Sequence, residues 1–113
     1  PFFIANMVIS FFYVPVGNAA EAASLGNLAI KEHLAACANV FPVQSVFMWE
    51  AIMQEESEFV LVLKTMPHKK NALREFLESK HSYKTPCILN WDAEVNAAYG
   101  SWVDRQVKGD IRI

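Results

Sequence analysis

Two neighbouring strand patterns in the middle of the chain constrain its fold more than any other feature. Residues 38–53 form one long pattern in which Pro42 marks a kink or an edge position, and residues 59–65 form a second. The polar residues 54–56 between them predict the turn of a β-hairpin. A solvated sheet face would show a polar residue at every second position, so we expect both apolar faces of this hairpin to be covered. The alternating side chains are Val46, Phe47, Met48 and Trp49 in the first strand and Phe59, Val60, Leu61, Val62 and Leu63 in the second.

Strands and helices alternate through the rest of the chain. Residues 7–14 are β-branched and aromatic with almost no alternation, which predicts a central strand covered on both faces. Helical patterns follow at residues 19–36, 68–80 and 97–107, and residues 87–91 predict one further strand. The order strand, helix, strand, strand, helix, strand indicates an α+β fold, the ferredoxin-like split βαβ arrangement (βαββαβ) with an added C-terminal helix.

Two residues indicate how the first helix is built. Asn18 is expected to be its N-cap, because an Asn side chain can accept a hydrogen bond from a free N–H of the first turn. Gly26 lies near the apolar side of the helix, where a missing side chain lets the helix approach a sheet closely.

The predicted layout places both long helices on one face of the sheet and leaves the other face uncovered. Hydrophobic residues make up 53% of the chain. The sheet residues that face the uncovered side are apolar, like those that face the helices. We therefore expect residues 1–113 to form a single domain whose bare face is covered by another subunit. Closed symmetric association is the usual way to achieve this.

Composition excludes several classes of partner. Ten Lys and Arg against twelve Asp and Glu give a net charge of −2, so no basic field is present to hold a nucleic acid. The longest apolar run, residues 7–14, is too short to cross a bilayer, so no membrane span is expected.

The two cysteines, Cys37 and Cys87, form no CxxC pair and no disulfide-dense pattern, which favours a reduced, cytoplasmic chain. They are expected on opposite edges of the sheet, so no disulfide should join them within one chain. Pro1 suggests that a leader has been cut away or left out, and a periplasmic or organellar location stays open.

Motifs of the common enzyme classes are missing. The loop at residues 15–18 has no Lys or Arg to cradle an anion, as acylphosphatase-type enzymes require, and no thiol pair for a heavy-metal chaperone. No phosphate-binding glycine loop, HExxH pair or GxSxG elbow occurs. Without a nucleophile and base in a recognisable arrangement, we predict that the protein is not an enzyme.

One specific resemblance covers nearly the whole chain, from about residue 7 to residue 107. The motifs keep the order and spacing of the signature of the CutA family of divalent-cation tolerance proteins. They are Leu34-Ala35-Ala36-Cys37-Ala38-Asn39, Pro42, Ser45, Trp49-Glu50, Glu58 and Leu63-Lys64-Thr65, followed by His81, Tyr83, Pro86, Asn96, Tyr99 and Trp102.

The resemblance implies a ferredoxin-like subunit in a tight homotrimer, similar in architecture to the nitrogen-regulatory PII proteins. Members of the family are linked to tolerance of copper and other divalent metals, and no enzymatic activity is established for them.

The chain departs from the family pattern at four positions. Ala51 stands where Gly is common, and Ser82 and Ala97 stand where Pro is common. Cys87 replaces a Glu that lies in the inter-subunit cavity of the family. Any function that needs a carboxylate at that position is therefore not carried over.

The resemblance implies that His81 is a metal ligand, for Cu(II) or another divalent ion, and Cys87 could add a thiolate. The alternative for His81 is a loop histidine that caps the preceding helix. Some relatives carry a second histidine, where this chain has Lys80, and a cysteine on the first strand, where none is present. The resemblance also implies a set of residues around the subunit boundary, with Cys37 as a small packed side chain. They are Cys37, Trp49, Glu50, Lys64, Tyr83 and Trp102.

Three functional hypotheses follow. The first is a non-enzymatic trimer that binds or responds to divalent metal ions such as copper. The second is a PII-like signalling trimer with a small molecule between its subunits, although residues 54–56 are far too few for the long contact loop of such proteins. The third, an enzyme acting in the inter-subunit cleft, has the least support.

Overall fold

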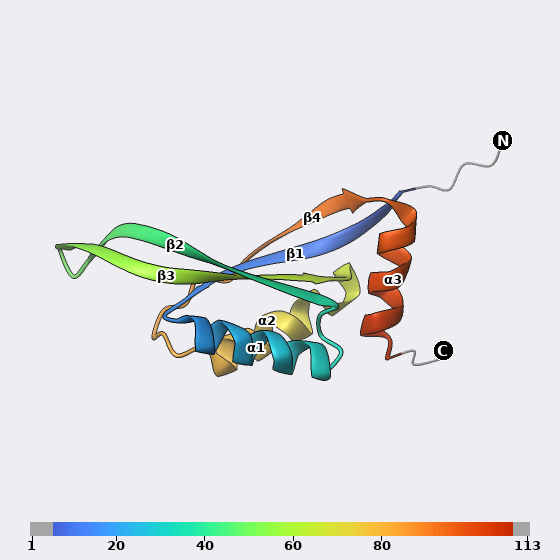
Figure 1. Ribbon diagram of the computed structural model, residues 1–113, viewed down its shortest axis with the longest axis horizontal. Coiled ribbons are helices and arrows are strands. Elements are labelled where there is room, and N and C mark those ends of the chain that lie inside the picture. The colour runs from blue at the N-terminus through green and yellow to red at the C-terminus, as the bar shows by residue number, and fades with distance from the viewer. Residues whose placement is uncertain (1–5, 110–113) are drawn as a thin grey trace.

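The first strand lies inside the sheet of the computed structural model, which describes residues 6–109. β1 (Met7–Val16) pairs with β3 (Ile52–Thr65) on one side and with β4 (Leu89–Val95) on the other, and β2 (Cys37–Trp49) pairs with β3. All pairs are antiparallel and the strand order is β2-β3-β1-β4 (Figure 1). The predicted α+β class and the central position of the first strand are confirmed.

The helices follow the predicted order. They are α1 (Ala19–Lys31), the short 3₁₀ helix η1 (Pro67–Lys69), α2 (Lys70–Lys80) and α3 (Ala97–Val107). α1 and α2 lie side by side under one face of the sheet (Figure 1). Their apolar sides meet the helix-facing side chains of the sheet in one buried cluster, which contains Phe12, Val14, Val16, Leu25, Leu61, Leu63, Leu73 and Leu77.

Both residues singled out in the first helix have the predicted role. Asn18 Oδ1 accepts the backbone N–H of Glu21 at 2.8 Å. At Gly26, a Cβ would lie 3.0 Å from Ala38 Cβ on β2, so only glycine allows this approach without a shift. The helix ends at Lys31 and not at residue 36, because His33 adopts a left-handed φ of 58°. Leu34 and Ala35 then donate their N–H groups back to Ala29 O.

The hairpin turn is not where the sequence predicted it. The chain turns at Glu50 and Ala51, which both have positive φ values (50° and 65°), and residues 54–56 belong to β3. Two consecutive left-handed residues match the twist of the flanking strands, so polar character alone was a wrong guide to the turn. β4 is also displaced from the predicted 87–91, because the pairing with β1 continues to Val95.

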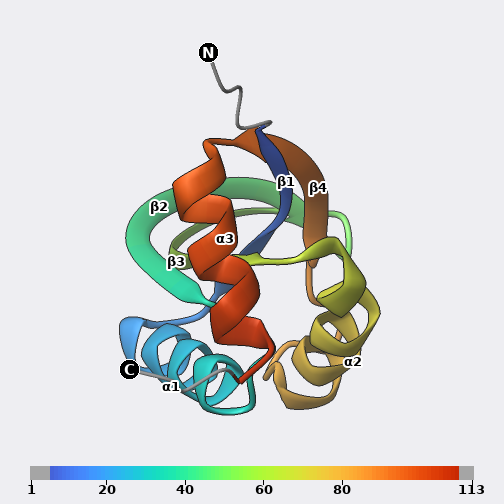
Figure 2. The ribbon, with the colours of Figure 1, turned by 90° about the vertical axis from the view of Figure 1, so that its right-hand side faces the viewer.

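α3 covers part of the face that α1 and α2 leave open. It crosses the end of the sheet (Figure 2) and forms a second buried cluster with Ile9 of β1 through Val103 and Val107. Farther along the same face, Phe41, Leu89 and Trp91 stay 40–52% exposed. The bare apolar face therefore exists as expected, but it is shorter than the topology alone suggested.

The β2–β3 hairpin projects beyond the rest of the molecule (Figure 1). β1 pairs only with residues 59–65 of β3, so residues 43–58 form a two-stranded ribbon. This ribbon ends in apolar side chains that are 58–64% exposed: Val46, Met48, Ile52 and Met53.

The close contact at Gly26 makes a prediction about stability. Gly26→Leu should lower the free energy of unfolding by about 1–3 kcal/mol, because the added side chain must displace Ala38 and the sheet. Urea unfolding measures the change. Ser24→Leu places the same side chain on an exposed position of α1 and should change the free energy by less than about 0.5 kcal/mol. Equal losses in the two variants would contradict the close approach.

Candidate functional site

A cleft of about 440 Å³ opens where the hairpin leaves the sheet. One wall comes from β2 and β3, and the other from the segment between α2 and β4. The lining residues are Pro15, Phe47, Trp49, Gln54, Glu56, Glu58, Tyr83, Lys84, Thr85 and Cys87.

The wall formed by β2 and β3 carries a row of polar side chains, because alternate residues of a β-strand point to the same face. Gln54, Glu56 and Glu58 occupy alternate positions of β3 and therefore share one face. Phe47 stands opposite Gln54 in the β2–β3 register, so an aromatic ring adjoins this row. The wall thus joins carboxylates to apolar surface.

Tyr83 fixes one of these carboxylates. Its hydroxyl donates a hydrogen bond to Glu58 Oε2 at 2.6 Å, and Glu58 is only 7% exposed. Burial first, and then the bond to the Glu58 carboxylate, raise the pKa of Tyr83 well above its usual range. The phenol therefore keeps its proton and stays a donor to Glu58.

His81 attaches the second wall to the end of β1. A carbonyl can only accept, so Nε2 donates to Pro15 O at 2.8 Å; Nδ1 accepts the N–H of Tyr83 at 3.0 Å. The ring is buried, and the N–H of His81 also ends α2 by donating to Leu77 O. Both ring nitrogens are engaged in this conformation. A metal-binding role for His81 stays a prediction that would require the Tyr83 N–H to release Nδ1.

Glu21 on α1 holds the next residue of the same wall. Its Oε2 accepts the N–H of Ser82 at 3.0 Å and its Oε1 accepts the Ser82 hydroxyl at 2.8 Å. Burial acts to raise the pKa of Glu21, but the two bonds from Ser82 and the nearby His81 outweigh it, so the pKa lies below its ordinary value.

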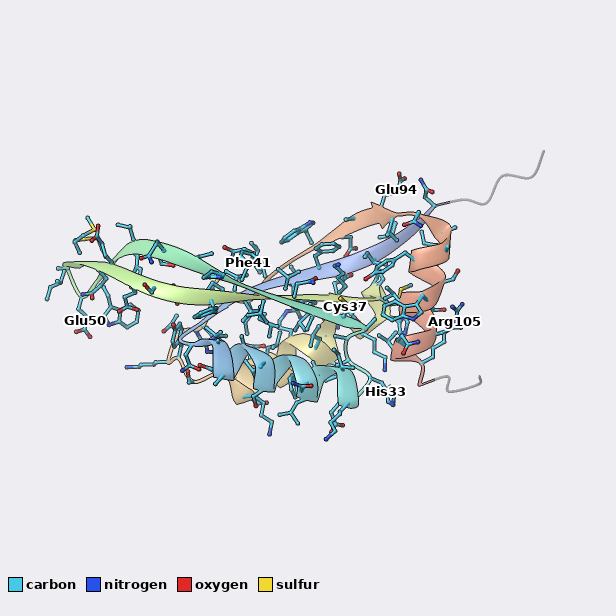
Figure 3. The ribbon with its side chains drawn as sticks, in the orientation of Figure 1. His33, Cys37, Phe41, Glu50, Glu94 and Arg105 are labelled. Carbon is cyan, nitrogen blue, oxygen red and sulfur yellow. The ribbon has the colours of Figure 1, made fainter. Side chains whose placement is uncertain are left out.

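The residues expected at one subunit boundary lie at two ends of the protomer. Trp49 and Tyr83 line the cleft, and Glu50 is at the hairpin tip (Figure 3). Cys37 lies at the other end, near α3 (Figure 3), directly across from its strand partner Lys64.

Aromatic rings surround Lys64 at the α3 end. Lys64 Nζ is 5.9 Å from the ring centre of Phe11 and 5.6 Å from that of Tyr99. Trp102 packs on Tyr99 with 5.5 Å between ring centres, so these side chains form one cluster.

The two cysteines are free; Cys37 is the first residue of the edge strand β2, and Cys87 lies two residues before β4, the strand at the other edge. Cys87 is exposed in the cleft, whereas Cys37 is half-buried. Among residues 6–109, no three His, Cys, Asp or Glu side chains come together as a metal site.

Sequence reasoning missed the polar row on β3 and the cation Lys84. The available signal was the spacing of Gln54, Glu56 and Glu58 at every second position. The turn that the polar character of residues 54–56 predicts obscures this spacing.

Comparison with known proteins agrees with this fold. The family model of the CutA1 divalent ion tolerance protein matches residues 10–106. The chain belongs to the CutA1 family. The divalent-cation tolerance protein CutA of Archaeoglobus fulgidus is 32% identical, over 88% of this chain and 98% of its own. The solved structure of this periplasmic protein from Archaeoglobus fulgidus superposes on the present chain with a TM-score of 0.84.

Other members of the CutA1 family differ in length. The solved structure of CutA from Synechococcus elongatus has a TM-score of 0.86 and 28% identity, covering 88% of this chain and 90% of that chain. The chloroplastic protein CutA of Arabidopsis thaliana is 36% identical over 68% of this chain, which spans only 43% of that relative. In the part of this chain that the structure describes, no helix has the length and hydropathy to cross a membrane.

Ser82 gives this CutA1 chain contacts that the common proline could not supply. Proline has neither a backbone N–H nor a hydroxyl, and Glu21 accepts both from Ser82. The departure from the family pattern therefore adds an attachment between the cleft wall and α1.

Ser82→Ala should raise the pKa of Glu21 towards its ordinary value of 4.5, because one hydrogen bond to the carboxylate is lost. A lowered folded-state pKa stabilises the protein above pH 4.5, and this contribution disappears as the pH falls through the folded-state value. The stability difference between wild type and Ser82→Ala should therefore be largest above pH 4.5 and shrink in acid.

Carboxyl-carbon NMR titration and urea unfolding at several pH values measure these two effects. Ser79→Ala, whose hydroxyl donates to Phe76 O on α2, is the control and should leave the pKa of Glu21 unchanged. A Glu21 pKa that is identical in wild type and Ser82→Ala would contradict the attachment.

Proposed function

We propose that this protein is a homotrimer that binds or responds to divalent metal ions such as copper and catalyses no reaction. The observation that carries the proposal is the apolar surface left exposed on the hairpin and on the open sheet face. Membership of a divalent ion tolerance family supports the part of the proposal that concerns divalent metal ions. We propose that residues 1–113 act as one domain.

The exposed surface supports assembly on physical grounds. Val46, Met48 and Met53 share one face of the ribbon and Ile52 lies on the other; within residues 6–109 no strand pairs beside the ribbon and no helix lies beneath it. Apolar patches of this kind on a folded chain mark protein–protein contacts, and a second copy of the same chain is the usual partner.

The position of the boundary residues supports a ring. The resemblance assigns Trp49, Glu50 and Tyr83 to the same boundary as Cys37, Lys64 and Trp102, yet the two groups lie at opposite ends of one protomer. Two ends can share one boundary if the hairpin end of one copy meets the α3 end of the next. Such head-to-tail contacts close into cyclic assemblies, of which the trimer is the proposed case.

The cleft supplies candidate metal ligands. Cys87 offers an exposed thiol, which as a thiolate suits copper and zinc, and Glu56 and Glu58 offer carboxylates. We propose Cys87 as the leading ligand within the pair His81 and Cys87, because both nitrogens of His81 are already engaged. A neighbouring copy would complete the coordination. The cytoplasmic location remains a proposal that the exposed free thiol supports.

A PII-like trimer with a small ligand between subunits is the second candidate. The cleft favours it, because about 440 Å³ is large enough for a small molecule. The two-residue turn at the hairpin tip is unlike the long contact loop with which PII-like proteins reach their partners.

Met48→Glu should dissociate the assembly, because it places a charge in the apolar contact surface. Sedimentation equilibrium should give three times the protomer mass of 12.8 kDa for wild type and the protomer mass for the variant. Leu28→Glu changes an equally apolar exposed residue on α1, outside the hairpin and the open face, and should remain a trimer. A wild-type protein that sediments as a protomer at low concentration would exclude the trimer.

Cys87→Ser should weaken Cu(II) and Zn(II) binding at least tenfold, because a hydroxyl is a poorer ligand than a thiolate for these ions. Calorimetric titration of the assembled protein measures the affinity and the stoichiometry. Glu75→Gln, which removes an exposed carboxylate from α2 outside the cleft and the boundary residues, is the control and should bind like wild type. Unchanged affinity in Cys87→Ser, with loss of binding in a folded His81→Ala variant, would instead make His81 the ligand.

A further inference from the structure

Two charged residues on β3 lack a counter-charge within the protomer. Glu58 and Lys64 lie on the same face of the strand, because an even number of positions separates them. This is the open face of the sheet, since Leu61 and Leu63 on the other face pack against the helices. Six strand residues span about 20 Å, which is too far for the two charges to pair within one copy. Among residues 6–109, neither side chain forms a salt bridge.

Glu58 supplies a fixed carboxylate at the hairpin end of the protomer. Only 7% of the residue is exposed, and the Tyr83 hydroxyl holds Oε2 at 2.6 Å. Within the described residues, Oε1 accepts no hydrogen bond. A neighbouring copy that covers the cleft removes the remaining water from this carboxylate, which is costly unless the same copy brings a positive charge.

Lys64 supplies a cation at the α3 end of the protomer. Its Nζ is 5.9 Å from the ring centre of Phe11 and 5.6 Å from that of Tyr99. Aromatic faces attract an ammonium group and hold it in place, but they do not neutralise its charge. The ammonium group therefore remains available to a carboxylate of another molecule.

We propose that the Lys64 ammonium group of one copy enters the cleft of the next copy and forms an ion pair with Glu58. The inference rests on the proposed homotrimer, in which the hairpin end of one copy meets the α3 end of its neighbour. Each copy carries one carboxylate and one ammonium group of this kind, so the same pair recurs at every boundary of a closed ring. Oε1 accepts the ammonium N–H, while Oε2 keeps its bond from Tyr83.

The other charges of the cleft favour Glu58 as the partner. Glu56 lies on the same face but is exposed, so it keeps more of its water and gains less from a cation. Lys84, the cation of the loop wall, is exposed as well and forms no salt bridge with the described residues. The buried carboxylate therefore gains most from the incoming ammonium group.

Such a pair also selects how the copies meet. Two hairpin ends in contact would place one Glu58 carboxylate against another, and two α3 ends would place two ammonium groups together. Both arrangements bring like charges into a covered contact, which disfavours them. The head-to-tail contact alone pairs opposite charges, so the pair favours a ring over a symmetric dimer of like ends.

A double-mutant cycle tests the pair in the full chain. Sedimentation equilibrium gives the dissociation constant of the assembly for wild type, Glu58→Gln, Lys64→Gln and the variant with both substitutions. Each single substitution should weaken assembly at least about tenfold, because it leaves the other charge covered and unpaired. The double variant should assemble at least as tightly as either single variant. Effects of the two substitutions that simply multiply would overturn the proposal.

A second series leaves Glu58 and its bond to Tyr83 intact, in case Glu58→Gln does not fold. Lys64→Arg keeps the charge and should assemble within about threefold of wild type, whereas Lys64→Met should lose at least about tenfold. Lys80→Met removes an exposed cation from α2, outside the boundary residues, and is the control. Wild type that sediments as a protomer would exclude the trimer itself. A wild-type trimer in which Lys64→Met and Lys80→Met assemble equally well would overturn the ion pair alone.

Discussion

The whole architecture depends on one mismatch in strand length. β3 continues well past the last residue that β1 can pair with, and β2 accompanies it, so a two-stranded ribbon leaves the four-stranded sheet. Such a ribbon has little stability alone in water, and its apolar side chains increase the need for a covering surface. The same departure from the sheet creates the cleft, because the ribbon forms one wall while the segment after α2 forms the other.

That second wall is held by polar contacts to segments distant in the sequence. His81 bonds to the end of β1, Ser82 to the first turn of α1, and Tyr83 to Glu58 on β3. Three consecutive residues thus tie the loop to three elements. A loop fixed in this way presents its side chains in defined positions, as a binding site requires. The protomer alone therefore holds this wall of the cleft in place, and in the proposed trimer a neighbouring copy could supply further residues to it.

The sequence predicted the topology because hydrophobic periodicity and element order reflect burial, which dominates folding. It misplaced the hairpin turn because the left-handed conformations of Glu50 and Ala51 have no signal in residue type, whereas the polar residues 54–56 gave a false one. That error also concealed the row that contains Glu58. The bond from Nε2 of His81 goes to Pro15, 66 residues away, and no local pattern reports such a contact. The metal ligands and the boundary residues remain predictions for the same reason, since a second copy decides them.

The left-handed residues at the hairpin tip affect the order in which the parts of the molecule fold. Neither Glu50 nor Ala51 is glycine, and each such conformation costs about 1–2 kcal/mol. Contacts inside the protomer do little to offset this cost, because the tip lies far from both buried clusters. In a newly synthesised protomer the four-stranded sheet and its helices would therefore fold first, while the projecting β2–β3 hairpin stays frayed. In the proposed trimer the hairpin would become rigid when neighbouring copies close around it, which would link the final step of folding to protein concentration.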